Sequence, residues 1–448
     1  MKGSQTRELE AIVRVEDLPP VSLPRSWLGE GSIPPVLVAP ESESQVAAVL
    51  ERASQEGWRV RPAGHLRAPL GGGESSPSII LSTRNLRKMV GYEPADLTFT
   101  AQAGMQWTGL QETTRERGQW LPLDPPGVRG GTLGGVVATG LSGPLRQAYG
   151  APRDHILGLT LISGDGRVLK WGGRVVKNVA GFDITRLTVG SWGALGVVTA
   201  VSARLFPLPE ADLTVLVRAP TLEDLLPLAS SMALSNLPFS AVELLEPLHP
   251  PLPGGAPDTA GTGGAALVLR FLASEAQARE VEDRIRKEVA SEASNTGGSI
   301  ATLWGEESAD VHRGLEEWGL GSELVLRLSL LPSGMKTLLE EARSFAEICS
   351  AHTSLAAHMG WGVLRVALSS IPAGGDGFAE VVRRIVSLRA RLEAAGGSLV
   401  VSAAPEALFR EVGCSGTENA VSELVRGLRA EFDPAGILSA GRPLGGLK

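Results

Sequence analysis

The sequence predicts an α+β fold in two domains, and three observations support this prediction. Near the start of the chain, strand-like and helical segments alternate in the order expected of a βαβ unit. Short strands separated by turns follow as far as residue 205, and beyond Pro207 and Pro209 the pattern changes to longer helices between strands. A chain of 448 residues is also long enough for two separate cores, since one domain usually takes about 100–200 residues.

We expect an N-terminal arm over residues 1–34, a first domain over residues 35–207 and a second over residues 208–448. Within the second domain, a run rich in proline and glycine predicts a flexible surface insert near residues 247–264. The strands of this domain include residues 266–273, which are almost entirely apolar.

The βαβ unit opens with a short strand over residues 36–40. Ser42 is positioned to cap the next helix, in which apolar residues recur at i, i+3, i+4 and i+7, and Gly57 is positioned to end it. The returning strand is expected over residues 58–62. The loop after it lies at the carboxyl end of a parallel sheet, where backbone N–H groups are exposed to a ligand.

The rest of the first domain is predicted to contain two more strands, over residues 78–83 and 97–104, and a helix over residues 108–117. Residues 156–171 have the pattern of a hairpin that turns about residues 164–166.

Glycine is frequent between Pro126 and Pro144. Ordering so many glycines on folding costs conformational entropy, which another interaction must offset. The usual compensation is a backbone that approaches a ligand more closely than a Cβ atom would permit. The hydroxyl groups of Thr132, Thr139 and Ser142 are interleaved with these glycines. This combination suits a flat, extended anion such as a dinucleotide. A purely structural set of glycine-rich turns is the alternative.

Two common nucleotide-binding motifs are missing. The glycines fall as GG-x-x-GG and not as the G-x-G-x-x-G of a Rossmann turn, and no Walker A sequence occurs.

Five sequence blocks follow one another in a fixed order, at residues 123–126, 132–144, 149–154, 172–187 and 190–199. They read LDPP, then TLGGVVATGLSGP, YGAPRD, GGRVVKNVAGFDITRL and GSWGALGVVT. In order and spacing they resemble the FAD-binding domain of the vanillyl-alcohol oxidase and p-cresol methylhydroxylase (PCMH) superfamily. Within that superfamily they most resemble the FAD-binding subunit of bacterial glycolate oxidase, also called glycolate dehydrogenase.

The resemblance implies a PCMH-type FAD-binding domain of two subdomains, followed by an α+β, ferredoxin-like cap domain of the FAD-linked oxidase type. It covers residues 35–207 well and continues as islands at residues 357–365 and 433–442, the second of which is expected to return near the flavin. The implied FAD contacts are Ala63, Gly64, His65, Leu66 and Arg67 at the pyrophosphate, Thr132, Gly134, Gly135, Thr139, Gly140 and Ser142 on a second wall, and Gly196 and Val197 near the adenine.

The pyrophosphate loop departs from the family pattern P-x-G-G-G-[TS]. Only one glycine remains, Leu66 stands where its bulk could obstruct a nest of amides, and Arg67 could compensate by pairing with phosphate. His65 aligns with the flavin-linking histidine of berberine-bridge-type oxidases, but non-covalent FAD is the prediction. The alternative is a subunit that has relaxed or lost its flavin site.

Oxidation of a 2-hydroxy acid needs a base, cations for the carboxylate, and the flavin N5 as hydride acceptor. Related catalytic subunits carry an H-x-G-D-G-x-x-H cluster, whereas this chain reads HMGWGVLR from His358 to Arg365. His358 and Arg365 are therefore the catalytic candidates, with a core histidine at the end of a strand as the alternative. No carboxylate or cysteine completes a metal site with His352 and His358, so no metal is predicted.

Composition excludes some partners. A net charge of −7 argues against nucleic acid, and the arginines of residues 383–391 predict a solvated helix face. Cys349 and Cys414 predict no disulfide framework and are too few to hold an iron–sulfur cluster. No run of 18 apolar residues and no apolar signal core occurs, so we expect a cytoplasmic protein that meets the inner membrane only through a partner.

These observations favour an FAD-binding redox subunit of a glycolate oxidase-like complex acting on a small 2-hydroxy acid. Its partners would be a larger FAD-containing oxidase subunit and an iron–sulfur subunit. Two alternatives stay open: a self-sufficient FAD-dependent hydroxy-acid or alcohol dehydrogenase, and a flavin-empty scaffold subunit.

Overall fold

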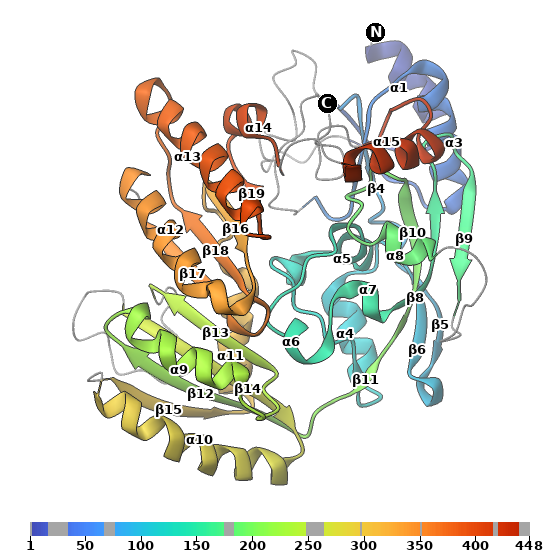
Figure 1. The fold of residues 1–448 in the computed structure, drawn as a ribbon. Helices are drawn as coiled ribbons and strands as arrows, with labels where there is room; N and C mark the ends of the chain where they lie inside the picture. The colour runs from blue at the N-terminus through green and yellow to red at the C-terminus, as the bar shows by residue number, and fades with distance from the viewer. Residues whose placement is uncertain are drawn as a thin grey trace.

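The structure is a computed structural model that describes residues 2–16, 35–66, 77–173, 183–247, 264–295, 298–349, 352–414 and 420–438. The chain folds into two layered units, one built on two small sheets and the other on a single large sheet covered by helices (Figure 1). The predicted α+β class is confirmed. None of the described helices combines the length and the apolar run needed to cross a bilayer.

The first small sheet has the order β1-β2-β4-β3, with β2, β4 and β3 parallel. The predicted βαβ unit is confirmed: the Ser42 side chain accepts a hydrogen bond from the N–H of Gln45, and Gly57 ends the helix at φ 67°. Apolar residues of this helix are fully buried against the sheet. The elements are α1 (Lys2–Glu10), β1 (Val15–Glu16), β2 (Val36–Val38), α3 (Glu43–Glu56), β3 (Val60–Ala63) and β4 (Ile79–Ser82).

The second small sheet is antiparallel, in the order β5-β6-β10-β8-β9, and contains the predicted hairpin as β8 and β9. Its core joins the sheet to α4 and α5. The elements are β5 (Met89–Glu93), β6 (Thr98–Gln102), α4 (Trp107–Arg115), β7 (Gln119–Trp120), α5 (Leu133–Thr139), α6 (Arg146–Tyr149), α7 (Pro152–His155), β8 (Ile156–Ile162), β9 (Val168–Gly172), α8 (Ile184–Thr188), β10 (Val197–Arg204) and β11 (Phe206–Pro207), which pairs with β7.

The large sheet has the order β15-β12-β14-β13-β17-β18-β16-β19 and consists of two βαββαβ units joined edge to edge through β13 and β17. Each unit has the strand order of a ferredoxin-like fold. The first contains β12 (Ala211–Ala219), α9 (Leu222–Leu234), β13 (Ala241–Glu246), β14 (Ala265–Ala273), α10 (Glu275–Asn295) and β15 (Ser299–Trp304). The second contains β16 (Leu324–Ser329), α12 (Met335–Cys349), β17 (Thr353–His358), β18 (Val363–Leu368), α13 (Gly375–Ala394) and β19 (Ser398–Ala403).

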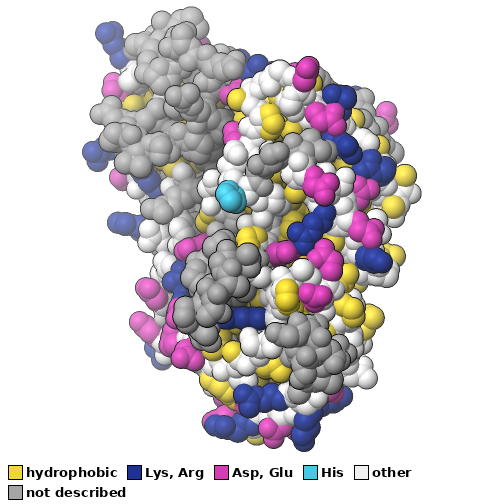
Figure 2. Space-filling view, turned by 90° about the vertical axis from the view of Figure 1, so that its left-hand side faces the viewer, with side chains coloured by type: hydrophobic (Ala, Val, Ile, Leu, Met, Phe, Trp, Pro, Cys, Tyr) yellow, Lys and Arg dark blue, Asp and Glu magenta, His cyan; other side chains and the backbone are white. Residues whose placement is uncertain are grey.

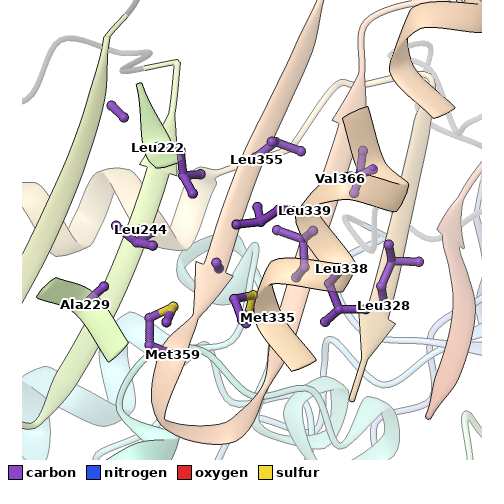
Figure 3. Close-up of a cluster of buried hydrophobic side chains, with 14 of the residues drawn as sticks. Leu222, Ala229, Leu244, Leu328, Met335, Leu338, Leu339, Leu355, Met359 and Val366 are labelled. Atoms are coloured by element: carbon purple, nitrogen blue, oxygen red, sulfur yellow. The ribbon is translucent and has the colours of Figure 1, made fainter. Parts of the chain in front are cut away.

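Four helices, α9, α10, α12 and α13, cover the outer face of the large sheet and bury one continuous apolar core against it, part of which is drawn in Figure 3. On the solvent side, acidic and basic side chains are interspersed (Figure 2). Arg383 and Arg384 pair with Glu380, as expected of a solvated face. For Arg389 the prediction of a solvated face is wrong, because this side chain is only 7% exposed. Its guanidinium donates to the carbonyls of Val412 and Gly413 at the end of α14 (Glu406–Val412).

The inner face of the large sheet meets the first unit. Helix α11 (Glu306–Glu317) lies on this face, and Leu141 and Trp192 of the first unit pack against the same apolar cluster. Helix α15 (Ala420–Phe432) then returns the chain to the first unit, where Leu438 forms a parallel bridge with Val60 of β3. The C-terminal segment thus returns to the first unit as far as Leu438, and its proximity to the flavin stays a prediction.

Candidate functional site

A cavity opens between the end of β3, helix α5 and the start of β10. Its empty volume is about 1030 Å³, including space open to solvent. Most of the predicted FAD contacts line it: Ala63, Gly64, His65, Leu66, Thr132, Gly134, Gly135, Thr139, Gly196 and Val197. Gly140 and Ser142 are not among the lining residues, and Arg67 lies outside the described residues.

Two adjacent glycines of α5 serve different purposes. A Cβ atom on Gly134 would lie 2.7 Å from the Cβ of Ala103, so this glycine lets α5 pack against the end of β6. A Cβ atom on Gly135 would meet only Oγ1 of Thr132, at 3.3 Å, and would otherwise point into open space. Thr132 itself caps the helix by accepting the N–H of Gly135. Of these two glycines, Gly135 is the one that keeps the cavity free of a side chain.

Two further predicted contacts have structural roles. Gly140 ends α5 at φ 60°, and a Cβ atom there would lie 3.0 Å from backbone atoms of Gly190. Gly196 has φ 153°, and its Cβ would lie 2.6 Å from the carbonyl oxygen of Ile162. Gly140 therefore ends the helix and Gly196 shapes the cavity wall, each through a backbone conformation that glycine adopts at low cost.

The pyrophosphate loop has one residue other than glycine in a conformation that favours glycine. Leu66 has φ 61°, the left-handed conformation that L side chains rarely adopt. Within the described part of the chain, the N–H groups of Gly64 and Leu66 donate no hydrogen bond. Nδ1 of His65 lies 3.4 Å from Nε2 of Gln106. Unused amides beside a cavity, at the carboxyl end of a parallel strand, fit a phosphate ligand, so these residues are compatible with FAD.

We predict that Leu66→Gly tightens FAD binding. Glycine removes a left-handed strain of about 1–2 kcal/mol, partly offset by a greater entropy cost of about 0.5–1 kcal/mol, so stability should change little. The loss of the isobutyl group should open the loop and lower the Kd for FAD, measured by flavin fluorescence titration of the apoprotein. Leu97→Gly is the matched control, because Leu97 has φ 53° far from the cavity. Equal or weaker FAD binding by Leu66→Gly would contradict the obstruction.

Part of the cavity wall was not predicted from the sequence. Pro125, Pro126 and Gly127 line it, as do Leu141 and Trp192. The LDPP block could have predicted Pro125 and Pro126, because it belongs to the series of motifs that resembles the FAD-binding family. No FAD contact was assigned to it. Trp192 carries no such signal: it reaches the cavity only because the chain turns there at φ 54°.

The two catalytic candidates lie on the inner face of the large sheet, outside the cavity wall. His358 ends β17 and is 3% exposed, and its Nδ1 lies 2.5 Å from Oε2 of Glu243 on β13, which is 1% exposed. The contact lacks hydrogen-bond geometry, and neither side chain has another hydrogen-bond partner among the described residues. Arg365 lies on β18 and donates to the carbonyl of Trp318 at 3.1 Å. Glu243 was not predicted, since no local pattern marks it.

Burial controls the ionisation of this pair. Desolvation raises the pKa of Glu243 well above its usual value. Desolvation, with the nearby charge of Arg365, lowers the pKa of His358 to about 3. Both effects favour the neutral forms, a protonated carboxyl group beside a neutral imidazole. The catalytic role of His358 and Arg365 stays a prediction.

Comparison with known proteins identifies the first domain. Residues 34–172 match the family model described as FAD binding domain, so the predicted cofactor, FAD, is confirmed. A mitochondrial D-lactate dehydrogenase [cytochrome] of Arabidopsis thaliana is 31% identical over 268 residues, 58% of this chain and 46% of that protein. Glycolate oxidase subunit GlcE of Escherichia coli is 40% identical over 163 residues, 36% of this chain and 46% of that protein. Glycolate oxidase subunit GlcD of Bacillus subtilis is 30% identical over 186 residues, 41% and 40% of the two chains.

The chain thus matches less than half the length of these relatives. The similarity in fold covers more of the chain than the similarity in sequence. A solved structure of alkyldihydroxyacetonephosphate synthase superposes with a TM-score of 0.69 at 15% identity, over 97% of this chain and 84% of that one. The matches to the FAD-binding domain and to this structure fit a PCMH-type FAD-binding fold.

Proposed function

We propose that this chain is the FAD-binding redox subunit of a glycolate oxidase-like complex that oxidises a small 2-hydroxy acid. The observation that carries the proposal is the cavity that collects residues from three separate sequence blocks, in a domain whose relatives include glycolate oxidase subunits and D-lactate dehydrogenases. The free amides of Gly64 and Leu66 would hold the pyrophosphate, and α5 would lie along the cofactor at Gly135. Bound FAD supplies a hydride acceptor.

The FAD is proposed to be non-covalent. His65 lies at the cavity, where its Nδ1 is 3.4 Å from Nε2 of Gln106. Release of all flavin from acid- or heat-denatured protein is the expected result. Flavin that stays with the denatured chain would support a linkage through His65, and purified chain without flavin would support the scaffold alternative.

Electron transfer onward is proposed to need other chains. Cys349 and Cys414 are both buried, and burial raises the pKa of the Cys349 thiol to about 11, which disfavours the thiolate that iron–sulfur clusters require. We therefore propose an iron–sulfur subunit and a larger FAD-containing oxidase subunit as partners, with the complex in the cytoplasm at the inner membrane. The named glycolate oxidase subunits among the relatives support a multi-subunit assembly.

The deciding experiment compares dye reduction by glycolate and by D-lactate, using the flavin-loaded chain alone and after co-expression with its partners. We expect turnover only in the complex. Comparable turnover by the chain alone would replace the proposal with a self-sufficient hydroxy-acid dehydrogenase. His358→Ala should leave the flavin content nearly unchanged, because His358 does not line the cavity.

A further inference from the structure

Two arginines from different parts of the chain converge on one tryptophan ring. Cζ of Arg146, on α6, lies 4.6 Å from the ring centroid of Trp361, and Cζ of Arg327, on β16, lies 6.0 Å from the same centroid. Trp361 belongs to a short turn between β17 and β18, and its ring also stacks on the imidazole of His358 at 4.7 Å. We call Arg146, Arg327 and Trp361 the arginine–tryptophan cluster.

Neither guanidinium of this cluster is neutralised. Both arginines are only partly exposed, yet in the described part of the chain neither has a carboxylate within 4.0 Å and neither guanidinium donates a hydrogen bond. The buried Arg270, by contrast, contacts Asp212 at 2.6 Å. Two unpaired cations brought together in a partly buried place are unfavourable in the absence of an anion.

The surroundings increase the positive charge. Arg365 lies directly opposite Arg327 in the β16–β18 ladder, so a third guanidinium shares this face of the sheet. The surrounding acids have other partners: Asp154, whose charge acts on Arg146, accepts the N–H of Ala151, Glu243 contacts His358, and Asp124 accepts the N–H of Leu145. Burial raises the pKa of Glu243 well above its usual value and that of Asp124 to about 6, which weakens both as counter-charges. Like charges directly opposite on a sheet are destabilising by themselves.

A polar group beside the arginines also lacks a partner. Nε1 of Trp361 is buried and has no hydrogen-bond acceptor among the described residues, although a buried indole N–H usually finds one. The cluster therefore presents two guanidinium forks and one further donor, but no acceptor. Such a donor set recognises a planar anion, because the guanidinium fork matches a carboxylate in two parallel hydrogen bonds.

The cluster lies on the face of the large sheet against which the FAD-binding unit packs. Val325 and Ala367, which flank Arg327 and Arg365 on the same sheet face, belong to the apolar cluster against which Leu141 and Trp192 pack. Leu141 and Trp192 also line the cavity. An anion held by the arginines would thus lie between the FAD-binding unit and the inner face of the large sheet.

We propose that Arg146 and Arg327, with the indole N–H of Trp361, form a binding site for the carboxylate of a small organic acid. The assignment of that acid as a 2-hydroxy acid substrate rests on the proposed function. A site contributed by two units of one chain, with both arginines only partly exposed, fits a small molecule better than an acidic side chain of another protein.

The test measures binding of oxalate and D-lactate to the flavin-loaded chain by isothermal titration calorimetry, with D-lactamide as the uncharged comparison. Arg146→Gln and Arg327→Gln should each weaken oxalate binding by about tenfold or more, and Arg146→Lys should weaken it less. Flavin content should not change, and the Tm of each glutamine variant should stay level or rise, because each variant removes an unpaired like charge. Arg383→Gln, on the outer helical face, is the control that should change nothing.

A purely structural role for the arginines would lower the Tm and leave oxalate affinity intact, which would overturn the proposal. No oxalate binding by the unaltered chain, D-lactamide binding as tight as D-lactate binding, or binding of an acidic peptide only would also overturn it. Oxalate binding that depends on both arginines in a complex without hydroxy-acid turnover would retain the anion site and reject the redox function. Hydroxy-acid turnover together with normal oxalate affinity in both glutamine variants would reject the anion site and retain the redox function.

Discussion

Replacing Gly135 by phenylalanine should abolish FAD binding while the protein stays folded. The backbone of Gly135 is helical, so a side chain adds no backbone strain, and its Cβ would have only Oγ1 of Thr132 nearby at 3.3 Å. The ring would then extend into the cavity that the cofactor needs. We expect the Kd for FAD to rise at least about tenfold and the flavin of the purified protein to fall accordingly. Flavin absorbance per chain and circular dichroism measure the two properties.

The neighbouring glycine supplies the matched comparison. Gly134→Ala adds one methyl group at 2.7 Å from the Cβ of Ala103 and 2.9 Å from its carbonyl oxygen, so the helix must shift away from β6. Overpacking of this kind costs about 1–3 kcal/mol of stability, to be read from urea unfolding. We therefore expect Gly135→Phe to lose flavin and Gly134→Ala to lose stability. Full flavin content in Gly135→Phe would place the cofactor elsewhere.

Glu316→Gln should stabilise the protein at alkaline pH. Glu316 lies near the end of α11, its side chain is 19% exposed, and its Oε2 lies 3.9 Å from Nη1 of Arg129 without a hydrogen bond. Burial, and then the charge of Asp124, raises the pKa of this carboxyl to about 7. A raised acid pKa means that the folded state holds a proton that the unfolded chain has released. Stability is therefore lost as the pH rises from the unfolded value, near 4.5, to about 7.

Above pH 7 this loss should amount to about 3 kcal/mol, and glutamine removes it because it carries no charge. Urea unfolding at pH 8.5 should show the stabilisation, and at pH 5 the gain should be under about 1 kcal/mol. Glu317→Gln is the control, since Glu317 is exposed. Equal destabilisation by Glu316→Gln at both pH values would show instead that a partner keeps the carboxylate ionised. Flavin content should not change, because only the carbonyl of Glu316 contacts the cavity wall, at the N–H of Gly127.

Local sequence was enough to predict the elements of the first domain and most of its cavity. The apolar spacing in α3, its Ser42 cap and its Gly57 end are set by neighbours within a few residues, and the structure confirms each of them. The glycine-rich blocks likewise identified the FAD-binding region, because close approach of a backbone to a ligand demands glycine wherever it occurs. These features depend on short-range sterics and hydrophobic periodicity, which the sequence displays directly.

The roles of individual residues depended on what lies across from them. Gly134 and Gly135 are equivalent in the sequence, and only the position of Ala103 makes one a packing residue and the other a cavity residue. Glu243 and His358 meet because β13 and β17 join the two ferredoxin-like units, a pairing fixed by the register of the whole sheet. The arginine–tryptophan cluster is assembled from a helix of one unit and a sheet of the other. The sequence by itself determined the fold class and the cofactor, whereas tertiary structure alone decided which charges share a buried space, because contacts between distant segments are set by packing and not by local pattern.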